Sequence, residues 1–427
     1  MAGDFVLPQR PGAAAVAAAE GVDGDRLWAR LMEMAAHGAT EAGGVNRQAL
    51  SDADIAARAL LRSWGAELGL EASVDTIGNL FLRLPGKDDG AAPVLSGSHL
   101  DSQPTGGKFD GAYGVLAALE AVEAMQGAGI EPARPIEIVA WTNEEGSRFS
   151  PGMMGSTVFT GARELDTVLA ARDGEGTTVG AALARVLDAE GDVPKRQLGG
   201  RPAAFVEAHI EQGPVLEAAG KSVGVVTGIE GKRVFRVTVI GKMGHAGTVP
   251  QGERQDAVIA AAAMVTAIGD AVAADGRGAK FTVGMFNVHP NAPSVIPAKV
   301  HFSVDMRHAD AVKLSALGDG IVRLCGENGM GCEVDVNELS HDAPLDFCQP
   351  MRSLIGAGSG ALAIPSMDVF SGAGHDARHL HYLCPTGMIF VPSRGGISHS
   401  EDEWTEPGHL ADGARVLTAV LATLATA

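Results

Sequence analysis

Four short polar segments of this chain contain five side chains that can bind a metal ion, and most of these side chains come where an apolar run ends. The segments are SHLDSQPTGGKFDG, TNEEGSRFSPG, EAHIEQGP and GISHSEDEW. The candidate ligands are His99, Asp110, Glu145, His209 and His399. Imidazole and carboxylate donors without cysteine suit zinc, manganese or cobalt acting as a Lewis acid. The pattern indicates a hydrolase site with two metal ions.

Strand and helix patterns alternate through the first half of the chain. Strand character is found in residues 93–102, 135–146 and 203–213. Helical spacing is found in residues 25–38, 52–69 and 111–129, with Ser51 as the expected N-cap of the second helix. This alternation predicts an α/β sheet, and such sheets bind ligands beyond the carboxyl ends of their strands. His99, the Glu144–Glu145 pair and His209 all fall at such ends.

The pattern changes near residue 230. From there the order is strand, helix, strand, strand, helix, strand, which is the ferredoxin-like plan. We therefore expect a small domain at residues 230–340, inserted into a catalytic domain made of residues 1–229 and 341–427. The helix expected at 406–427 completes the catalytic domain.

Composition narrows the classes of partner. The net charge of −19 argues against nucleic acid and anionic membranes as partners. Four cysteines form no CxxC pair, which favours the reduced thiols of a cytoplasmic enzyme. The first residues lack a basic region followed by a strong apolar core, and no apolar stretch reaches about 20 residues, so we expect neither a signal peptide nor a membrane span.

Each candidate ligand has a simpler interpretation when it is taken alone. Asp110 stands before Gly111 and a helix, so it could be a helix cap. His209 ends an apolar strand and could be a core histidine, and His399 lies among acids and could be a surface residue. Asp101, two residues after His99, could hold that imidazole from the same strand face, or could have a surface or capping role.

The Glu144–Glu145 pair is more specific. Two adjacent acids after an apolar run repel each other unless a positive charge lies between them. In a regular strand they would point to opposite faces, so the chain must leave the strand here. One carboxylate could bind metal while the other moves protons, and a solvated turn is the alternative.

Two residues of the expected insertion could also act on a substrate. His245 lies between glycines in KMGHAGTVP, where its ring would be accessible and could polarise an oxyanion. Arg307 ends a strand in VDMRH, and its fork suits a carboxylate. A surface ion pair is an equal alternative for Arg307.

Taken together, these motifs resemble the dinuclear-zinc amidohydrolases of the aminoacylase/carboxypeptidase superfamily, in the branch of N-carbamoyl-L-amino-acid hydrolases, β-ureidopropionases and allantoate amidohydrolases. The matching segments are GSHLDSQPTGGKFDG, NEEGSRF, EAHIEQGPVLE, GHAGTVP, DMRH, SGAGHDA and GISHSEDEW, between about Leu95 and Glu403. The resemblance implies a zinc-exopeptidase-like α/β catalytic domain with an inserted ferredoxin-like lid and dimerisation domain. It also implies a homodimer.

The resemblance assigns roles to individual residues. It implies that a first ion binds His99, Asp110 and His209, and that a second binds Asp110, Glu145 and His399. It implies that Glu144 is the general base, that Asp101 supports His99, and that His245 reaches the site from the partner subunit. Substrate contacts are implied for Gln212, for Arg307 on a substrate carboxylate, and for His375 in SGAGHDA. Relatives carry a cis peptide after the bridging aspartate, so the resemblance implies one at Asp110–Gly111.

One departure concerns the substrate. The family usually has Asn-Val-Ile-Pro in the inserted domain, where the Asn contacts substrate, but this chain has Ser294 there and Asn291 is the candidate replacement. The resemblance implies hydrolysis of the ureido C–N bond of an N-carbamoyl amino acid to amino acid, ammonia and carbon dioxide. Allantoate or another N-acyl amino acid is the alternative substrate. A binding protein without turnover is the alternative class, and Glu144 argues against it because a binding site needs no base.

Overall fold

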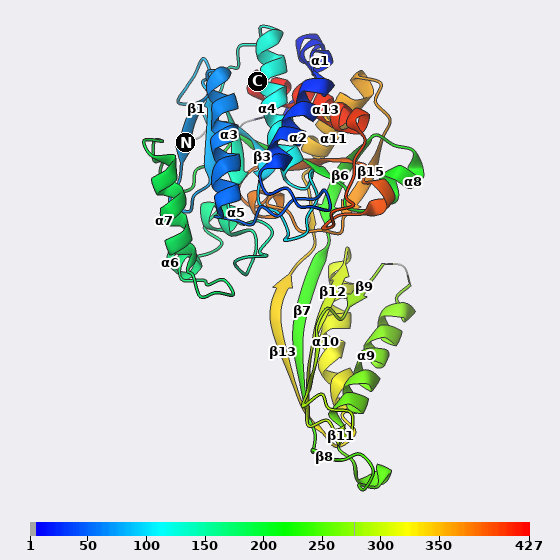
Figure 1. Cartoon of the computed structure of the whole chain (residues 1–427). Helices are drawn as coiled ribbons and strands as arrows, with labels where there is room; N and C mark the ends of the chain where they lie inside the picture. The colour runs from blue at the N-terminus through cyan, green and yellow to red at the C-terminus, as the bar shows by residue number, and fades with distance from the viewer. Residues whose placement is uncertain (1–5, 277) are drawn as a thin grey trace. The chain divides into compact units, whose positions relative to one another are not determined.

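The protein consists of two compact units, which are seen in a computed structural model that describes residues 6–276 and 278–427 (Figure 1). The first unit comprises residues 1–227 and 347–427, and the second comprises residues 228–346. The insertion thus runs from 228 to 346, where the sequence suggested 230 to 340. The last strand of the second unit is longer than expected, and a two-residue strand follows it, so the boundary moves toward the C-terminus.

A mixed sheet forms the framework of the first unit, in the order β1-β2-β4-β3-β5-β16-β6-β14, with β15 paired to β6; its edge strand β14 belongs to the last residues of the second unit. The strands are β1 (Glu71–Val74), β2 (Leu80–Leu84), β3 (Val94–His99), β4 (Ile136–Trp141), β5 (Ala204–Ile210), β6 (Val223–Ile229), β14 (Leu345–Asp346), β15 (Ser366–Ser371) and β16 (Thr386–Val391). The neighbours β4, β3, β5 and β16 are parallel and buried along their whole length. Their carboxyl ends therefore meet at one edge, where a parallel sheet presents its ligands.

Helices cover this sheet and bury its apolar faces (Figure 1). They are α1 (Ala13–Glu20), α2 (Gly24–Ala36), α3 (Asp52–Glu67), α4 (Ala112–Gly127), α5 (Met154–Phe159), α6 (Leu165–Leu169), α7 (Val179–Glu190), α8 (Val215–Ala219), α11 (Gln349–Ala361), α12 (Ala377–Leu380) and α13 (Pro407–Ala425). Helices α4 and α13 pack on each other and on β3 and β5, and α1 and α2 cover them in turn, so both are apolar almost all round. Ser51 caps α3 through Asp54 N, as predicted.

The second unit has the predicted ferredoxin-like order. Its main elements are β7 (Gly231–Ile240), α9 (Ala257–Ala274), β9 (Lys280–Thr282), β10 (Phe286–His289), β12 (Lys299–His308), α10 (Ala311–Glu327) and β13 (Glu333–Asp342). The antiparallel sheet has the order β10-β12-β7-β13, and β9 also pairs with β12. Both helices pack on one face, because inward residues alternate along β7 and β12. A separate small pair joins β8 (Gly244–His245) to β11 (Val295–Ile296).

Helix α9 is the one described helix that is long and apolar enough to cross a membrane by length and composition. Its inner face is buried against the sheet, where Met264 and Ile268 are almost completely covered. Asp270 lies on its exposed face. Core helices of small domains meet the same criterion, so this composition alone is weak evidence for a span.

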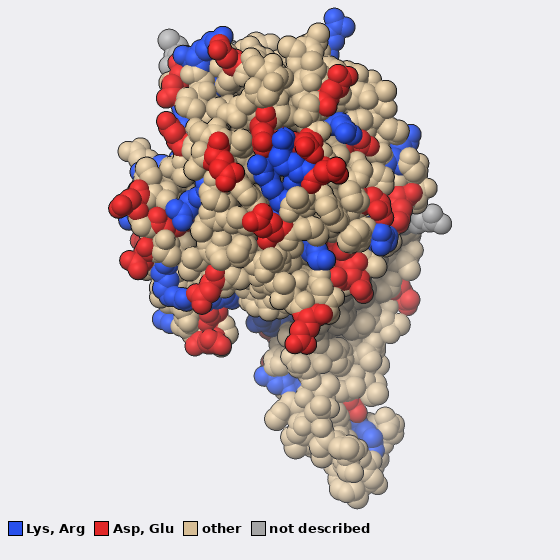
Figure 2. Space-filling view, turned by 45° about the horizontal axis from the view of Figure 1, so that its top comes forward, with Lys and Arg blue, Asp and Glu red and all other residues tan. Residues whose placement is uncertain are grey.

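On the face drawn in Figure 2, Lys and Arg side chains are interspersed with Asp and Glu rather than gathered by sign. Several of the charges are paired: Arg83, for example, lies 2.9 Å from both Asp89 and Glu137.

Candidate metal centre

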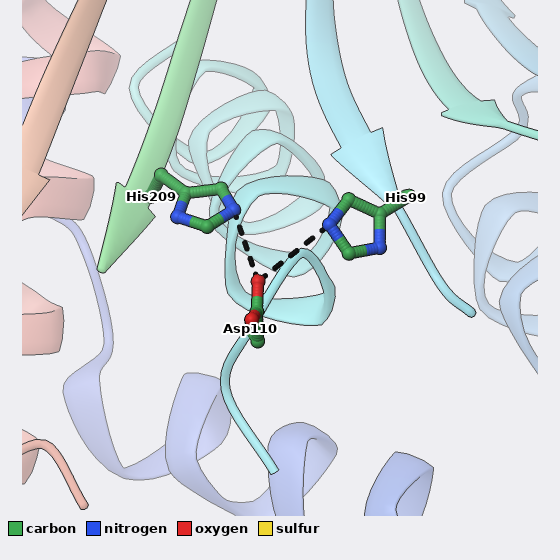
Figure 3. A group of neighbouring side chains, drawn as sticks. All are labelled: His99, Asp110 and His209. Carbon is green, nitrogen blue, oxygen red and sulfur yellow. Dashed lines mark ion pairs between the residues drawn. The ribbon is translucent and has the colours of Figure 1, made fainter. Parts of the chain in front are cut away.

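Two neighbouring strands and the start of one helix bring three candidate ligands together (Figure 3). His99 ends β3 and His209 lies near the end of β5, so their rings are side by side with centroids 6.0 Å apart. Asp110 stands just before α4 and points between them. Its Oδ1 lies 3.2 Å from His209 Nε2 and 3.6 Å from His99 Nε2. All three side chains are at least 94% buried.

The protonation of the two imidazoles shows that this group suits a cation. His99 Nδ1 lies 2.8 Å from the carbonyl oxygen of Asp101, and His209 Nδ1 lies 2.9 Å from that of Ile210. A carbonyl oxygen only accepts hydrogen bonds, so Nδ1 carries the proton in both rings. In neutral rings both Nε2 lone pairs then face a carboxylate oxygen that also only accepts. His209 Nε2 is buried and forms no hydrogen bond. A divalent ion among these three atoms would satisfy all of them.

A second group meets the other oxygen of Asp110. His399 Nε2 lies 3.3 Å from Asp110 Oδ2 and 3.4 Å from Glu145 Oε2. Each oxygen of Asp110 thus lies near a different group, which is the arrangement that a carboxylate needs to bridge two ions. The His399 side chain is 50% exposed, so this group opens to solvent. Hydrogen bonding to Asp110 raises the pKa of His399 to about 9 in the metal-free chain, against the effect of burial.

The chain leaves the sheet at the glutamate pair, as predicted. Strand β4 ends at Trp141, and Asn143 takes a positive φ of 53°. The Asp101 carboxylate accepts the N–H groups of Glu144 and Glu145, each at 3.2 Å. Asp101 reaches His99 through its main-chain carbonyl, and its carboxylate lies 3.8 Å from the ring. The Asp101 carboxylate thus lies beside His99 and also forms a clamp on the Glu144–Glu145 backbone.

Glu144 has the properties of a proton carrier. Its Oε2 lies 3.6 Å from His99 Nε2, at the edge of the first group. Burial, reinforced by the carboxyl groups of Asp376, Glu145 and Asp101, raises the pKa of Glu144 well above its usual value, although His99 opposes this. A carboxyl group with a raised pKa can take and return a proton near neutral pH.

Gln212 and His375 also lie at this centre. Gln212 Nε2 donates to Asp110 Oδ2 at 2.9 Å and to Ser398 Oγ at 3.1 Å. The His375 ring packs edge-on against His209, with centroids 4.5 Å apart, and its Nε2 is 3.0 Å from Ser371 Oγ. Burial, together with His209, lowers the pKa of His375 well below its usual value.

The remaining predicted residues belong to the second unit. His245 lies in β8, where Val295 of β11 is its partner, and it is exposed. Ser294 accepts a hydrogen bond from Ala246 N at 3.1 Å, so the departure from the family pattern lies beside His245. Asn291 is exposed, with a φ of 56°.

Arg307 is engaged by a carboxylate within its own unit. Its Nε and Nη2 donate to the two oxygens of Asp305 at 2.9 and 3.0 Å. Asp305 is two residues earlier on β12, hence on the same face of the strand. The arginine fork therefore already binds a carboxylate in the two-point manner expected of it.

Two supporting residues were not predicted from the sequence. Glu403 Oε1 accepts the N–H groups of Phe109 and Asp110 at 3.0 and 3.1 Å, and its Oε2 accepts from Ser398 Oγ at 2.8 Å. Gln103 Nε2 donates to Glu145 Oε2 at 2.7 Å. Both residues hold candidate metal ligands in position. The only signal for either residue in the sequence is that it lies near a candidate ligand.

The expected cis peptide at Asp110–Gly111 was wrong. Among the described residues, the cis bonds are Ser150–Pro151 and His289–Pro290. The chain turns instead through the positive φ of Gly111, which is 64°. A Cβ there would lie 2.3 Å from His99 Cε1, so only glycine fits this approach.

The central strands of the sheet are parallel, and histidines and carboxylates lie together at their carboxyl ends. This arrangement is typical of α/β metallohydrolases. Residues 95–423 match the family described as peptidase family M20/M25/M40, and the chain belongs to this metal-dependent family. Three predictions from the sequence are thereby confirmed: the family resemblance, the α/β fold class, and that the protein is an enzyme.

Several relatives are similar over nearly their full length. The N-carbamoyl-L-amino-acid amidohydrolase of Rhizobium meliloti is 41% identical, over 93% of this chain and 95% of that protein. The allantoate amidohydrolase of Bacillus subtilis (strain 168) is 34% identical, over 92% of this chain and 95% of that protein. Among solved structures, an amidase of the hydantoinase/carbamoylase family from Burkholderia multivorans has a TM-score of 0.85 and 44% identity, over 95% of this chain and 98% of that one.

Proposed function

We propose that this enzyme hydrolyses the ureido C–N bond of N-carbamoyl amino acids, giving the amino acid, ammonia and carbon dioxide. One observation carries the proposal: Glu144, a carboxyl group that is 11% exposed and has a raised pKa, lies beside a group that could hold a cation, built from His99, Asp110 and His209. That pairing is what hydrolysis of an unactivated amide-like bond requires. The relative from Rhizobium meliloti, which carries the name N-carbamoyl-L-amino-acid amidohydrolase, supports the substrate class.

The centre would hold two divalent ions. The first would bind His99, Asp110 and His209, and the second would bind Asp110, Glu145 and His399. Bound ions supply Lewis-acid polarisation of the carbonyl and acidify the attacking water. Zinc suits these donors best, with manganese or cobalt as alternatives.

The side chains of the first unit would handle the proton. Glu144 accepts a proton from the attacking water and returns it to the leaving nitrogen, as a general base and then a general acid. The clamp from Asp101 keeps its backbone in place. Gln212 presents its amide to the substrate, and His375, which stays neutral, lies close enough to His209 to border the substrate.

The second unit would contribute to substrate binding. Arg307 would take the substrate carboxylate in competition with Asp305, which holds the same fork here. Asn291 lies in the segment just before Ser294 and would replace the missing family Asn. Because Ser294 lies beside the His245 segment, a side chain different from the family pattern there is expected to alter which substrates fit.

The active unit would be a homodimer formed through the second unit, with His245 of one chain stabilising the oxyanion at the centre of the other. Ferredoxin-like sheets have exposed edges whose pairing buries unpaired backbone groups. The protein would be cytoplasmic, because all four cysteines, each within the described residues, are free thiols.

Mixing two inactive variants tests this sharing. His245→Ala and Glu144→Gln homodimers should each be inactive, but subunit exchange between them should restore activity. In the mixed dimer one site has both an intact Glu144 and an intact His245, while the other lacks both. The measurement is ammonia release before and after exchange, with exchange followed by native mass spectrometry. Mixed dimers that form but stay inactive, or a fully active monomer, contradict the shared site.

A substrate panel tests the proposed reaction. Ammonia release should be measured with metal-loaded protein on several N-carbamoyl-L-amino acids, N-carbamoyl-β-alanine and allantoate. We expect the largest kcat/KM for an N-carbamoyl amino acid. A larger value for allantoate would favour the alternative suggested by the Bacillus subtilis relative.

A further inference from the structure

The two metal-binding groups around Asp110 differ in how well they are enclosed. His99 and His209 are 2% and 1% exposed, whereas the His399 side chain is 50% exposed. In the first group both rings are also held at Nδ1 by main-chain carbonyl oxygens. An ion there would enter a rigid and dry arrangement, whereas the second group faces water.

The two groups also differ in the hydrogen bonds that the two oxygens of their shared ligand, Asp110, accept. Within the described residues, Asp110 Oδ1 faces the two imidazole nitrogens of the first group, at 3.2 and 3.6 Å. Asp110 Oδ2, by contrast, accepts a hydrogen bond from Gln212 Nε2 at 2.9 Å and lies 3.2 Å from Ser398 Oγ. The same Gln212 nitrogen lies 3.4 Å from His399 Nε2. A donor therefore stands among the ligand atoms of the second group.

The backbone supports this position of Gln212. Its φ is 56°, and its N–H donates to Ser393 Oγ at 3.0 Å, so the side chain projects from a fixed turn at the end of β5. Gln212 Oε1 is buried and has no hydrogen-bond partner. The Gln212 amide is therefore bound to Asp110 through its nitrogen, while its carbonyl oxygen has no hydrogen bond in this position.

We propose that the two ions bind in sequence, the buried group first, and that Gln212 lowers the affinity of the second group by occupying Asp110 Oδ2 until an ion takes that oxygen. This inference rests on the proposed two-ion centre. The release of Gln212 leaves its amide available to the substrate, so substrate recognition by this residue depends on full loading. Gln212 is in this sense a positioning residue that couples metal content to binding.

Ion release from loaded protein tests the proposal without any assay of activity. Zinc-loaded protein is mixed with a chromogenic chelator, and released zinc is followed over time. Wild-type protein should release one ion per chain in a fast phase and one in a slow phase. His399→Ala should bind one ion per chain and show only the slow phase, because its substitution removes only the second group.

The Gln212→Asn variant then isolates the amide. Asparagine tolerates the positive φ but is one methylene too short to reach Asp110. The fast phase should slow by about tenfold or more, the scale of a lost hydrogen bond to a charged group, while the slow phase is unchanged. Gln126→Asn, in which an exposed glutamine that bonds Leu68 O is shortened, is the matched control and should leave both phases as in wild type.

The outcomes separate the two proposals. Fewer than two ions per loaded wild-type chain would overturn both the two-ion centre and the order of loading. Two ions leaving in a single phase would overturn the order alone. A fast phase that is unchanged or faster in Gln212→Asn would show that Gln212 does not compete for Asp110.

Discussion

Replacing Glu144 by glutamine is expected to lower kcat by at least about 10²-fold, the usual scale of general acid–base catalysis. The amide keeps the shape of the side chain but cannot accept a proton from water. Its backbone N–H would still bond Asp101, so the neighbouring ligand Glu145 should stay in place. The measurement is steady-state kinetics on the best N-carbamoyl substrate, with metal content determined on the same sample.

Metal content decides how this result is understood. Glu144→Gln with wild-type metal content and low kcat supports a role in proton transfer. Glu123→Gln, on the outer side of α4 and paired with Arg26 and Arg30, is a control that should retain full turnover. Near-normal turnover of Glu144→Gln would remove Glu144 from the mechanism.

Removal of metal should have the largest effect, loss of activity to background. The stripped chain would also lose the free energy of ion binding, so it should melt at a lower temperature. An ion that binds the folded state only stabilises it by RT ln(1 + [ion]/Kd), which is about 4 kcal/mol at a thousandfold excess over Kd. Dialysis against a chelator, followed by return of zinc, manganese or cobalt, measures activity and melting temperature together.

Recovery on return of metal is the essential control, because it shows that the stripped chain is still folded. Full activity in protein with one ion or none per chain would contradict the two-ion centre. An unchanged melting temperature would contradict a buried cation at His99 and His209.

The grouping of the candidate ligands could be predicted because several of them stand where an apolar run ends, and the fold brings such ends together. His99 and His209 end apolar runs, and parallel strands bring such ends to one edge. Two carboxylates at 144 and 145 cannot both belong to a strand, and the chain does turn away there. The ferredoxin-like order was also readable, since its strands and helices have clear periods of two and 3.6.

Long-range support could not be predicted in the same way. Glu403 bonds the N–H of Phe109 across 294 residues, and nothing near Glu403 distinguishes it from the acids beside it. Strand periodicity predicted that the Asp101 carboxylate lies beside His99, but it could not predict that the same carboxylate accepts the backbone N–H groups of the loop after β4, because β3 ends at His99. Sequence periodicity indicates the direction of a side chain only within a regular helix or strand, and not in the loop that follows it.

The bonds made by Glu403 have a consequence for how this protein is made. They fix Asp110 only after the last segment of the chain has returned to the start of α4, and closing so long a loop is slow compared with forming local contacts. A nascent chain that has reached only His209 has the three ligands proposed for the first ion but lacks the carboxylate that orients Asp110. We therefore expect uptake of ions to follow synthesis of the C-terminal segment.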